Sequence, residues 1–331
     1  MNIFQFSFII PFIYLSIITA TNAKENVITA QKINLYNPQQ RANSFDECQD
    51  IFPEDDPEKT IQPTFTNAGK WQLRRLCSND FAVLYSDKTR TPLLVIEKLN
   101  AKILSKNITR TDDFFADPRL PTKQRAQLSD YRNLANIDRG HLAPARNATS
   151  IQGMAQTFAF SNIVPQNANN NRNAWKKIEN DTYKFASRTQ TDVYVFTGVL
   201  FPDQERTKKI GKNQIWQPSH LYKVIYHPEK NKSWAFVIAN QPNQDIKQIS
   251  YDEFKNKTGI KFGILEDSFS AKSQSLFSNL LTGAMFVYLA DAVSPDHLWT
   301  SIKDKSNSLW NDTLHTVVSW LKENDKKNPD E

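Results

Sequence analysis

Five apolar runs of strand length constrain the fold of this chain more than any other feature of its sequence. They lie at 81–86, 92–99, 193–201, 221–226 and 234–240. Each run is rich in the branched and aromatic residues that favour buried strands. One amphipathic helix is indicated among them, at 172–188, where Trp175, Ile178, Thr182 and Phe185 fall on one face. Strands separated by so few helices predict an α+β fold rather than a series of βαβ units.

The composition is that of a globular protein with a basic body. The 331 residues are 39% hydrophobic and 23% charged. These values exclude collagen, a coiled-coil rod, a multi-span membrane protein and a wholly disordered chain. The net charge is +6, but it is unevenly distributed: residues 24–265 carry +10 and residues 266–331 carry −4. A basic body of this kind favours anionic partners.

The first 23 residues have the properties of a signal peptide. They contain no charged residue, and an apolar run spans residues 4–18. Thr21 and Ala23 are small enough for a signal-peptidase site, which would make Lys24 the first mature residue. We therefore predict that residues 1–23 are removed and that the protein is exported, to the periplasm or the extracellular medium. An uncleaved membrane anchor is the alternative interpretation.

Cys48 and Cys77 are the only two cysteines in the chain. An even number in an exported protein predicts one disulfide between them. Two free thiols are the alternative, and neither cysteine has the CxxC or His spacing of a zinc site. Both lie in residues 24–80, an irregular stretch that contains several prolines. We interpret this stretch as an N-terminal extension stabilised by the disulfide.

The last 66 residues, 266–331, differ from the body in charge and in pattern. Residues 276–293 are predominantly apolar, and residues 310–321 place apolar side chains along one helical face. These patterns predict a helical C-terminal extension made of two helices that pack on the body. Contact with another protein or with a membrane surface is the alternative use of the segment.

The residues that could carry chemistry lie between positions 138 and 179. Arg139 and His141, in the sequence DRGH, combine a fixed cation with a side chain that can accept a proton near neutral pH. Asn162 and Asn171 follow, and Glu179 falls on the predicted helix. Together they suit phosphodiester cleavage. That reaction needs an activated water, a hard cation such as Mg²⁺ on the phosphate, and help for the leaving oxygen.

The spacing of Asn171 and Glu179 limits how they could bind one cation. Eight residues of regular helix rise about 12 Å, too far for both side chains to ligate the same ion directly. We therefore place Asn171 at the start of the helix, where it could also cap it. Glu179 would then act through metal-bound water. A solvent-facing Glu179 without such a role is the alternative that spacing alone allows.

Four motifs follow one another in this region. They are FFADPRLP at 114–121, DRGHLAPA at 138–145, TFAFSNIVPQ at 157–166 and NRNAWKKIE at 171–179. In order and spacing they resemble the sugar-non-specific DNA/RNA endonuclease family, which includes the Serratia-type nuclease and mitochondrial endonuclease G. The resemblance covers about residues 80–265. It implies a nuclease domain at 81–265, with a ββα-metal core on a central antiparallel sheet flanked by helices.

The resemblance also implies a role for each candidate residue. His141 would be the general base, and Arg139 would stabilise the pentacovalent phosphate and the departing oxygen. Asn171 would ligate a single Mg²⁺, with Mn²⁺ as the alternative ion, and Glu179 would hold water in its coordination shell. Asn162 would support the histidine and its loop. The implied products carry 5′-phosphate ends.

An exported, Mg²⁺-dependent endonuclease is the function that these features predict. It would bind DNA and RNA through their backbones, and a homodimer is one assembly it could form. A nuclease toxin delivered to rival cells is a variant of this hypothesis. The alternative from another class of protein is a basic nucleic-acid-binding protein without catalysis. The presence of His141, Asn171 and Glu179 argues against this alternative. The other histidines lack metal-ligand spacing, and we interpret them as structural. They are His220, His227, His297 and His315.

Overall fold

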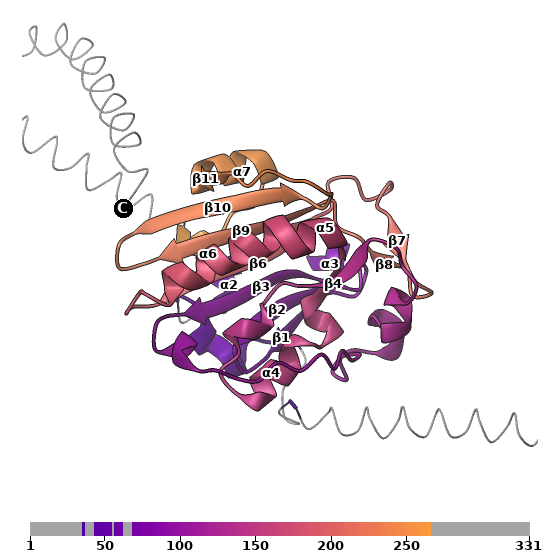
Figure 1. The fold of residues 1–331 in the computed structure, drawn as a ribbon, viewed down its shortest axis with the longest axis horizontal. Coiled ribbons are helices and arrows are strands. Elements are labelled where there is room, and N and C mark those ends of the chain that lie inside the picture. Colours follow the sequence, from indigo (N-terminus) through magenta and orange to yellow (C-terminus); the bar gives the residue numbers. More distant parts are fainter. Residues whose placement is uncertain (1–34, 37–42, 55, 62–67, 266–331) are drawn as a thin grey trace, which may run out of the picture. The chain divides into compact units, whose positions relative to one another are not determined.

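A seven-stranded sheet forms the centre of the fold in a computed structural model that describes residues 35–36, 43–54, 56–61 and 68–265 (Figure 1). All neighbouring strands in this sheet are antiparallel. Their order in space is β1 (Leu73–Cys77), β2 (Phe81–Ser86), β3 (Thr91–Leu99), β6 (Val193–Leu200), β9 (His220–His227), β10 (Lys232–Ala239) and β11 (Gln248–Ser250). The five predicted strands are confirmed as β2, β3, β6, β9 and β10.

The central strands are buried along nearly their whole length, which explains their continuous apolar sequences. Every residue of β2 is buried, and in β6 and β9 only one terminal residue of each strand is partly exposed. A sheet with one wet face would instead alternate apolar and polar residues. Helix α6 (Lys176–Ala186) lies across β6 and β9 in Figure 1, and its Ile178 belongs to the main core. Phe254 of α7 (Tyr251–Thr258) joins the same core.

The segment before β2 is part of the folded body. It contains η1 (Asp46–Ile51), α2 (Pro57–Ile61), α3 (Ala68–Trp71) and the edge strand β1. The predicted disulfide is present: Cys48 of η1 is bonded to Cys77 at the end of β1, with their Cα atoms 5.6 Å apart. Phe45, Ile51 and Ile61 are buried in the main core. Residues within the stretch 24–80 therefore contribute a strand and apolar packing to the domain.

A smaller unit of two strands and a helix carries the candidate site. Strands β4 (Ile137–His141) and β5 (Ile163–Asn167) form an antiparallel pair outside the large sheet. A helical segment follows directly, made of α5 (Ala168–Asn170), the π-helical turn η7 (Asn171–Trp175) and α6. The predicted helix at 172–188 thus begins at residue 168 and ends at residue 186. This is the ββα arrangement that the family resemblance implied.

Shorter elements complete the body. They are η2 (Ile103–Ser105), η3 (Thr122–Gln124), η4 (Leu128–Tyr131), η5 (Ala145–Asn147), α4 (Ile151–Thr157), η6 (Phe160–Asn162), β7 (Lys209–Ile210) and β8 (Ile215–Trp216). Helix α7 has clear end signals. The Ser250 hydroxyl accepts a hydrogen bond from the Glu253 N–H at 3.1 Å, and Gly259 ends the helix with a positive φ of 71°.

All the described residues belong to one unit of the chain, Met1–Ser268. The predicted signal peptide at 1–23 and the predicted helices of 266–331 lie outside the described residues. In the part of the chain that is described, no helix is both long and apolar enough to cross a bilayer.

Candidate active site

Strand β4 places Arg139 and His141 two residues apart, so their side chains leave the same face of the strand. Gly140 lies between them, where β4 passes close to Gln166 of β5. A Cβ atom at Gly140 would lie 2.1 Å from the Gln166 Oε1 atom and 2.8 Å from its Cβ atom. Gln166 is fully buried and donates a hydrogen bond to Asn170 at 2.8 Å, so it has little freedom to move away. Glycine at this position is therefore required by the close approach of the two strands.

Two aromatic rings hold the His141 imidazole. The Phe158 ring meets it edge-on with centroids 5.0 Å apart, and the Phe114 ring centroid is 5.5 Å away. The imidazole Nε2 atom is buried and has no hydrogen-bond partner among the described residues. Burial, reinforced by the charges of Arg110 and Arg139, lowers the pKa of His141 to about 3. The imidazole is therefore neutral over the physiological pH range.

The same two rings support two guanidinium groups. Arg139 lies over Phe114 at 4.2 Å from the ring centroid, and Arg110 lies over Phe158 at 5.0 Å. Both arginines are exposed. Sequence reasoning missed Arg110 as a site residue. It lies four residues before the FFADPRLP motif, and only the tertiary fold brings it beside His141.

Asn162 fixes the loop that follows His141. Its amide oxygen accepts a hydrogen bond from the Ala143 N–H at 2.9 Å, and its amide nitrogen donates to the Ala143 carbonyl at 3.0 Å. The amide nitrogen also donates to the Thr157 carbonyl at 2.9 Å. Asn162 is fully buried, so these bonds satisfy a side chain that would otherwise destabilise the core. The contacts agree with the supporting role expected for this residue.

Asn171 occupies the first position of the π-helical turn η7, a distortion often found at functional sites. Its amide nitrogen donates to the Asp138 Oδ2 atom at 2.9 Å. Arg172 donates two further hydrogen bonds to this carboxylate, at 2.9 and 2.7 Å. Although burial opposes them, the hydrogen bonds from Arg172 and Asn171 hold the pKa of Asp138 below its usual value. Asp138 is thus an ionised acceptor that fixes which way the Asn171 amide is turned.

Asn171 does not cap the helix, so that prediction was wrong. The cap is Asn167, whose side-chain oxygen accepts a hydrogen bond from the Asn170 N–H at 3.1 Å. Because the helical segment starts at Ala168, Asn171 already lies inside its first turns. Its side chain does not cap the helix and instead reaches Asp138, near the start of β4.

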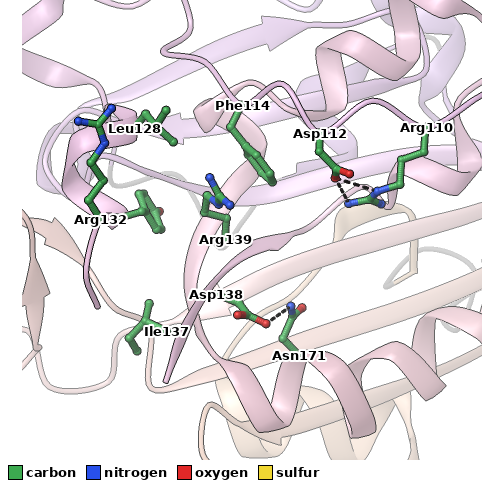
Figure 2. A pocket seen from close by; sticks show the side chains of 10 residues that line it. Arg110, Asp112, Phe114, Leu128, Arg132, Ile137, Asp138, Arg139 and Asn171 are labelled. Carbon is green, nitrogen blue, oxygen red and sulfur yellow. Dashed lines mark hydrogen bonds and ion pairs between the residues drawn. The ribbon is translucent and has the colours of Figure 1, made fainter. Parts of the chain in front are cut away.

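An open pocket of about 530 Å³ lies over this arrangement (Figure 2). We call it the first basic pocket. Three guanidinium groups line it, those of Arg110, Arg132 and Arg139, together with Asn171 and Asp138. Figure 2 shows the Asn171 side chain reaching from its helix toward Asp138. Arg139 is the next residue after Asp138 on β4. The pocket therefore combines cations for an anionic ligand with an amide of fixed orientation.

Glu179 lies two helical turns beyond Asn171 and does not line this pocket. It is half-buried, so its carboxyl does not face solvent freely. Burial raises the pKa of Glu179 to about 7; Lys223 opposes this shift and the nearby Glu97 carboxyl adds to it. Lys223 is almost fully buried and donates to the Thr197 hydroxyl at 2.5 Å.

Glu97 is a second carboxyl that lies near Lys223 and Glu179. It is 2% exposed and accepts a hydrogen bond from the Asn147 amide at 2.9 Å, but its second oxygen has no partner among the described residues. Burial raises the pKa of Glu97 to about 7, against the lowering effect of Lys223. The Glu97 and Glu179 carboxyls thus both interact electrostatically with the buried Lys223. Sequence reasoning found neither Glu97 nor Lys223.

The residues present fit a hard divalent cation. Among the described residues, no group of three or more His, Cys, Asp or Glu side chains could bind a metal by itself. A site built from one amide oxygen and several waters needs no such group, and that mode suits Mg²⁺. Glu179, whose charged form is disfavoured by burial and by Glu97, would gain from a nearby positive charge.

The two described histidines outside the site have structural partners. His227 is buried at the end of β9 and its Nε2 atom lies 2.8 Å from the Thr191 hydroxyl. His220 contacts the Ser219 hydroxyl at 3.0 Å. Both contacts agree with the structural interpretation, whereas His297 and His315 lie outside the described residues.

Two strands followed by a helix, with His on the first strand and Asn on the helix, define the ββα-metal class of nuclease folds. Comparison with solved structures supports this class. A chain in the crystal structure of the EndoG/EndoGI complex, which concerns EndoG inhibition, matches with a TM-score of 0.51 and 29% sequence identity. The match covers 58% of this chain and 86% of that one.

The chain belongs to the DNA/RNA non-specific endonuclease family, whose sequence model matches residues 56–266. Human mitochondrial nuclease EXOG is 34% identical over 207 residues, which are 56% of each chain. Human mitochondrial endonuclease G is 38% identical over 164 residues, 46% of this chain and 54% of that one. A nuclease of Nostoc is 27% identical over 203 residues, 56% of this chain and 72% of that one. The human and zebrafish EXOG matches span 56% and 62% of those relatives' lengths.

Proposed function

We propose that this protein is an exported, Mg²⁺-dependent endonuclease that cleaves DNA and RNA with little sequence specificity and leaves 5′-phosphate ends. The observation that carries this proposal is the neutral His141 imidazole, held by two aromatic rings beside the guanidinium groups of Arg110 and Arg139. It is supported by family membership and by relatives that are named as nucleases.

His141 removes a proton from the attacking water in this proposal. A general base must be unprotonated at the working pH, which the low pKa of this imidazole ensures; the negative charge of a phosphate bound beside Arg110 and Arg139 would raise this pKa and so make the imidazole a stronger base. Arg139 and Arg110 stabilise the negative charge that grows on the phosphate oxygens during attack. Their stacking on Phe114 and Phe158 holds them in place before substrate binds. Asn162 keeps the loop after His141 in position.

Asn171 would hold the divalent cation through its amide oxygen, with Glu179 binding a water of the coordination shell. When bound, Mg²⁺ supplies charge stabilisation to the phosphate and the leaving oxygen, and Mn²⁺ is the alternative ion. Asp138 accepts the Asn171 amide N–H and so leaves the amide oxygen available. The π-helical turn η7 begins at Asn171 and ends before α6, which carries Glu179. This turn therefore sets how the two side chains are arranged on the helical segment.

Low sequence specificity follows from the chemistry of the pocket. Guanidinium groups recognise phosphate oxygens, which are the same for every base and for DNA and RNA. The net +10 of residues 24–265 adds a long-range attraction for both polymers. A homodimer remains one assembly that this proposal allows, and residues 266–331 are candidates for contact with a protein or a membrane surface.

Export to the periplasm or the extracellular medium is part of the proposal. It is supported by the uncharged apolar residues 1–23 and by the Cys48–Cys77 bond, because disulfides persist in oxidising compartments. Six of the relatives, among them human EXOG and human endonuclease G, are named as mitochondrial, and that location is theirs.

The proposal is tested by incubating purified protein with supercoiled plasmid and with RNA, with Mg²⁺ or with EDTA. We expect Mg²⁺-dependent degradation of both polymers and 5′-phosphate termini on the fragments. Binding without cleavage under every divalent cation tried would favour the non-catalytic binding protein instead.

A further inference from the structure

A second basic pocket lies beside the first and shares one residue with it. Its volume is about 310 Å³, and Arg110 contributes to the walls of both pockets. The remaining walls come from residues 104–108, from Arg146, from Met154 and from Tyr183 of α6. A ligand that lies along the first basic pocket and past Arg110 would therefore reach the second.

The charged side chains that line the second basic pocket are all positive. Lys106, Arg110 and Arg146 line it, and no carboxylate does. The first pocket differs, because Asp112 and Asp138 contribute to its lining. All three cations of the second pocket are exposed, so they are accessible to a ligand in solution. Arg110 also forms an ion pair with Asp112 at 3.0 Å, so among the described residues Lys106 and Arg146 provide the positive charge without an ion-pair partner that attracts and orients an anion.

Arg146 is held in a fixed position. Its guanidinium lies 3.6 Å from the centroid of the Tyr183 ring, and one of its nitrogens donates a hydrogen bond to the Asn180 side-chain oxygen. Among the described residues it has no carboxylate partner within ion-pair distance. A guanidinium has five N–H donors, so most of them stay available. Because the group is already ordered, binding a phosphate costs less conformational entropy.

Helix α6 connects this pocket to the proposed catalytic site. Asn180 and Tyr183, which hold Arg146, lie one and four residues after Glu179 on the same helix. Arg146 is close enough to Glu179 for its charge to act on that carboxyl. The second basic pocket is thus fixed relative to the place where the phosphodiester would be cut.

We propose that the second basic pocket binds the phosphate of a neighbouring nucleotide on the strand whose scissile phosphate occupies the first. This inference rests on the proposed function and extends it, since it makes a polynucleotide with a further phosphate the preferred substrate class. Lys106 and Arg146 bind that phosphate, and Arg110 lies between the two phosphate positions. Contact with a phosphate carries no base information, so the pocket adds affinity without sequence preference.

A binding experiment tests the pocket without any need for catalysis. Fluorescence anisotropy would measure the affinity of the wild-type protein for a single-stranded oligonucleotide in EDTA, over a range of salt concentrations. The double variant Lys106→Gln/Arg146→Gln should bind about tenfold more weakly at low salt. The slope of log affinity against log salt should become shallower by roughly 0.7, since the variant no longer neutralises one phosphate and each neutralised phosphate accounts for about 0.7 on a single strand.

The matched control removes two charges at the C-terminal end of α6, one on the helix and one just after it. Lys184 and Arg188 are exposed and line neither pocket. The Lys184→Gln/Arg188→Gln variant should keep the wild-type slope. Arg146→Lys, which preserves the charge, should retain most of the affinity. If the pocket variant and the control variant weaken binding equally, the charge is acting non-specifically and the proposal is overturned.

A kinetic experiment then separates this proposal from the catalytic one. The dinucleotide TpT contains only the scissile phosphate, whereas pTpT and TpTp each add one phosphate at an end. The wild-type ratio of kcat/KM for the better extended substrate to that for TpT should be about ten. Arg146→Gln should bring this ratio close to one, and an unchanged ratio would overturn the proposal. If the wild type cleaves none of the three or longer DNA and RNA, the nuclease function fails and the binding experiment alone decides about the pocket.

Discussion

The Asn171 amide nitrogen donates a hydrogen bond to the Asp138 carboxylate at 2.9 Å, and this bond joins the helical segment to the strand that carries His141. It determines the orientation of the amide and leaves the amide oxygen for a cation. Asp138 is itself held by Arg172, so the acceptor cannot easily turn away. The ligand and the base are thereby positioned through two residues of β4, Asp138 and His141, that lie three positions apart.

Asp138→Ala should therefore weaken the response to Mg²⁺ more than it weakens the fold. Losing a residue that orients a metal ligand typically costs 10- to 100-fold in metal affinity or activity, so we expect a shift of about this size in the Mg²⁺ concentration for half-maximal cleavage. Asp252→Ala is the control, because Asp252 is an exposed carboxylate on α7 that does not line the pocket. An unchanged Mg²⁺ titration in the Asp138 variant would show that the bond does not prepare a metal ligand.

The pKa of His141 gives a second prediction. Burial, Arg110 and Arg139 lower it to about 3, so the imidazole should stay neutral as the pH falls from 8 to 4. The unfolded chain takes up a proton near the ordinary pKa of about 6.5, so this histidine makes the unfolding free energy decrease as the pH falls below that value. NMR titration of the imidazole resonances measures the pKa directly. A midpoint near 6.5 would contradict the buried, cation-flanked environment.

Glu97 should have the opposite effect on stability. Its pKa is raised to about 7 in the folded protein, so between the ordinary value and 7 the folded state binds more protons than the unfolded state. The unfolding free energy therefore falls as the pH rises through this range. The Glu97→Gln variant has no carboxyl proton to lose at this position. Between pH 5 and 8 its unfolding free energy should therefore fall by about 1–3 kcal/mol less than that of the wild type.

Urea denaturation in EDTA at both pH values measures this difference for Glu97→Gln. Glu205→Gln is the control, because Glu205 is exposed in a loop and its variant should follow the wild type. If Glu97→Gln loses as much stability as the wild type, the buried carboxyl is not the source of the pH dependence.

The disulfide gives a prediction about stability alone. The Cys48–Cys77 bond closes a loop with a sequence separation of 29, which in the chain-entropy model stabilises the protein by about 3–4 kcal/mol. Cys48→Ser/Cys77→Ser should lower the melting temperature, and dithiothreitol should lower that of the wild type but leave the variant unchanged. Labelling of two free thiols in the native, exported protein would contradict the bond.

Much of the fold was predictable because the central strands are buried on both faces. Burial of this kind produces unbroken apolar runs such as 81–86, which the structure reproduces residue for residue as β2. The start of the helical segment was placed too late, since Asn167 rather than Asn171 provides the cap. A cap and a π-helical turn both depend on local hydrogen bonds that Asn-rich sequence leaves ambiguous.

The candidate site was predictable only where its residues share a short motif. Arg139 and His141 stand out in DRGH, and the ββα unit carries them as expected. Arg110 and Lys223 reach the site from other parts of the chain, and nothing in their own neighbourhoods marks them. The electrostatic environment of His141 and Glu179 comes largely from such distant residues, so it required the structure.

The most direct test of the central claim compares His141→Ala with the wild type on a supercoiled plasmid in the presence of Mg²⁺. A general base contributes about 10²–10⁴-fold to the rate, so the variant should lose at least that much cleavage. Its affinity for an oligonucleotide, measured by anisotropy in EDTA, should stay within about twofold of wild type, because the arginines of the pocket provide the phosphate contacts. Cleavage by His141→Ala at the wild-type rate would contradict the proposed role of this histidine and the account built on it.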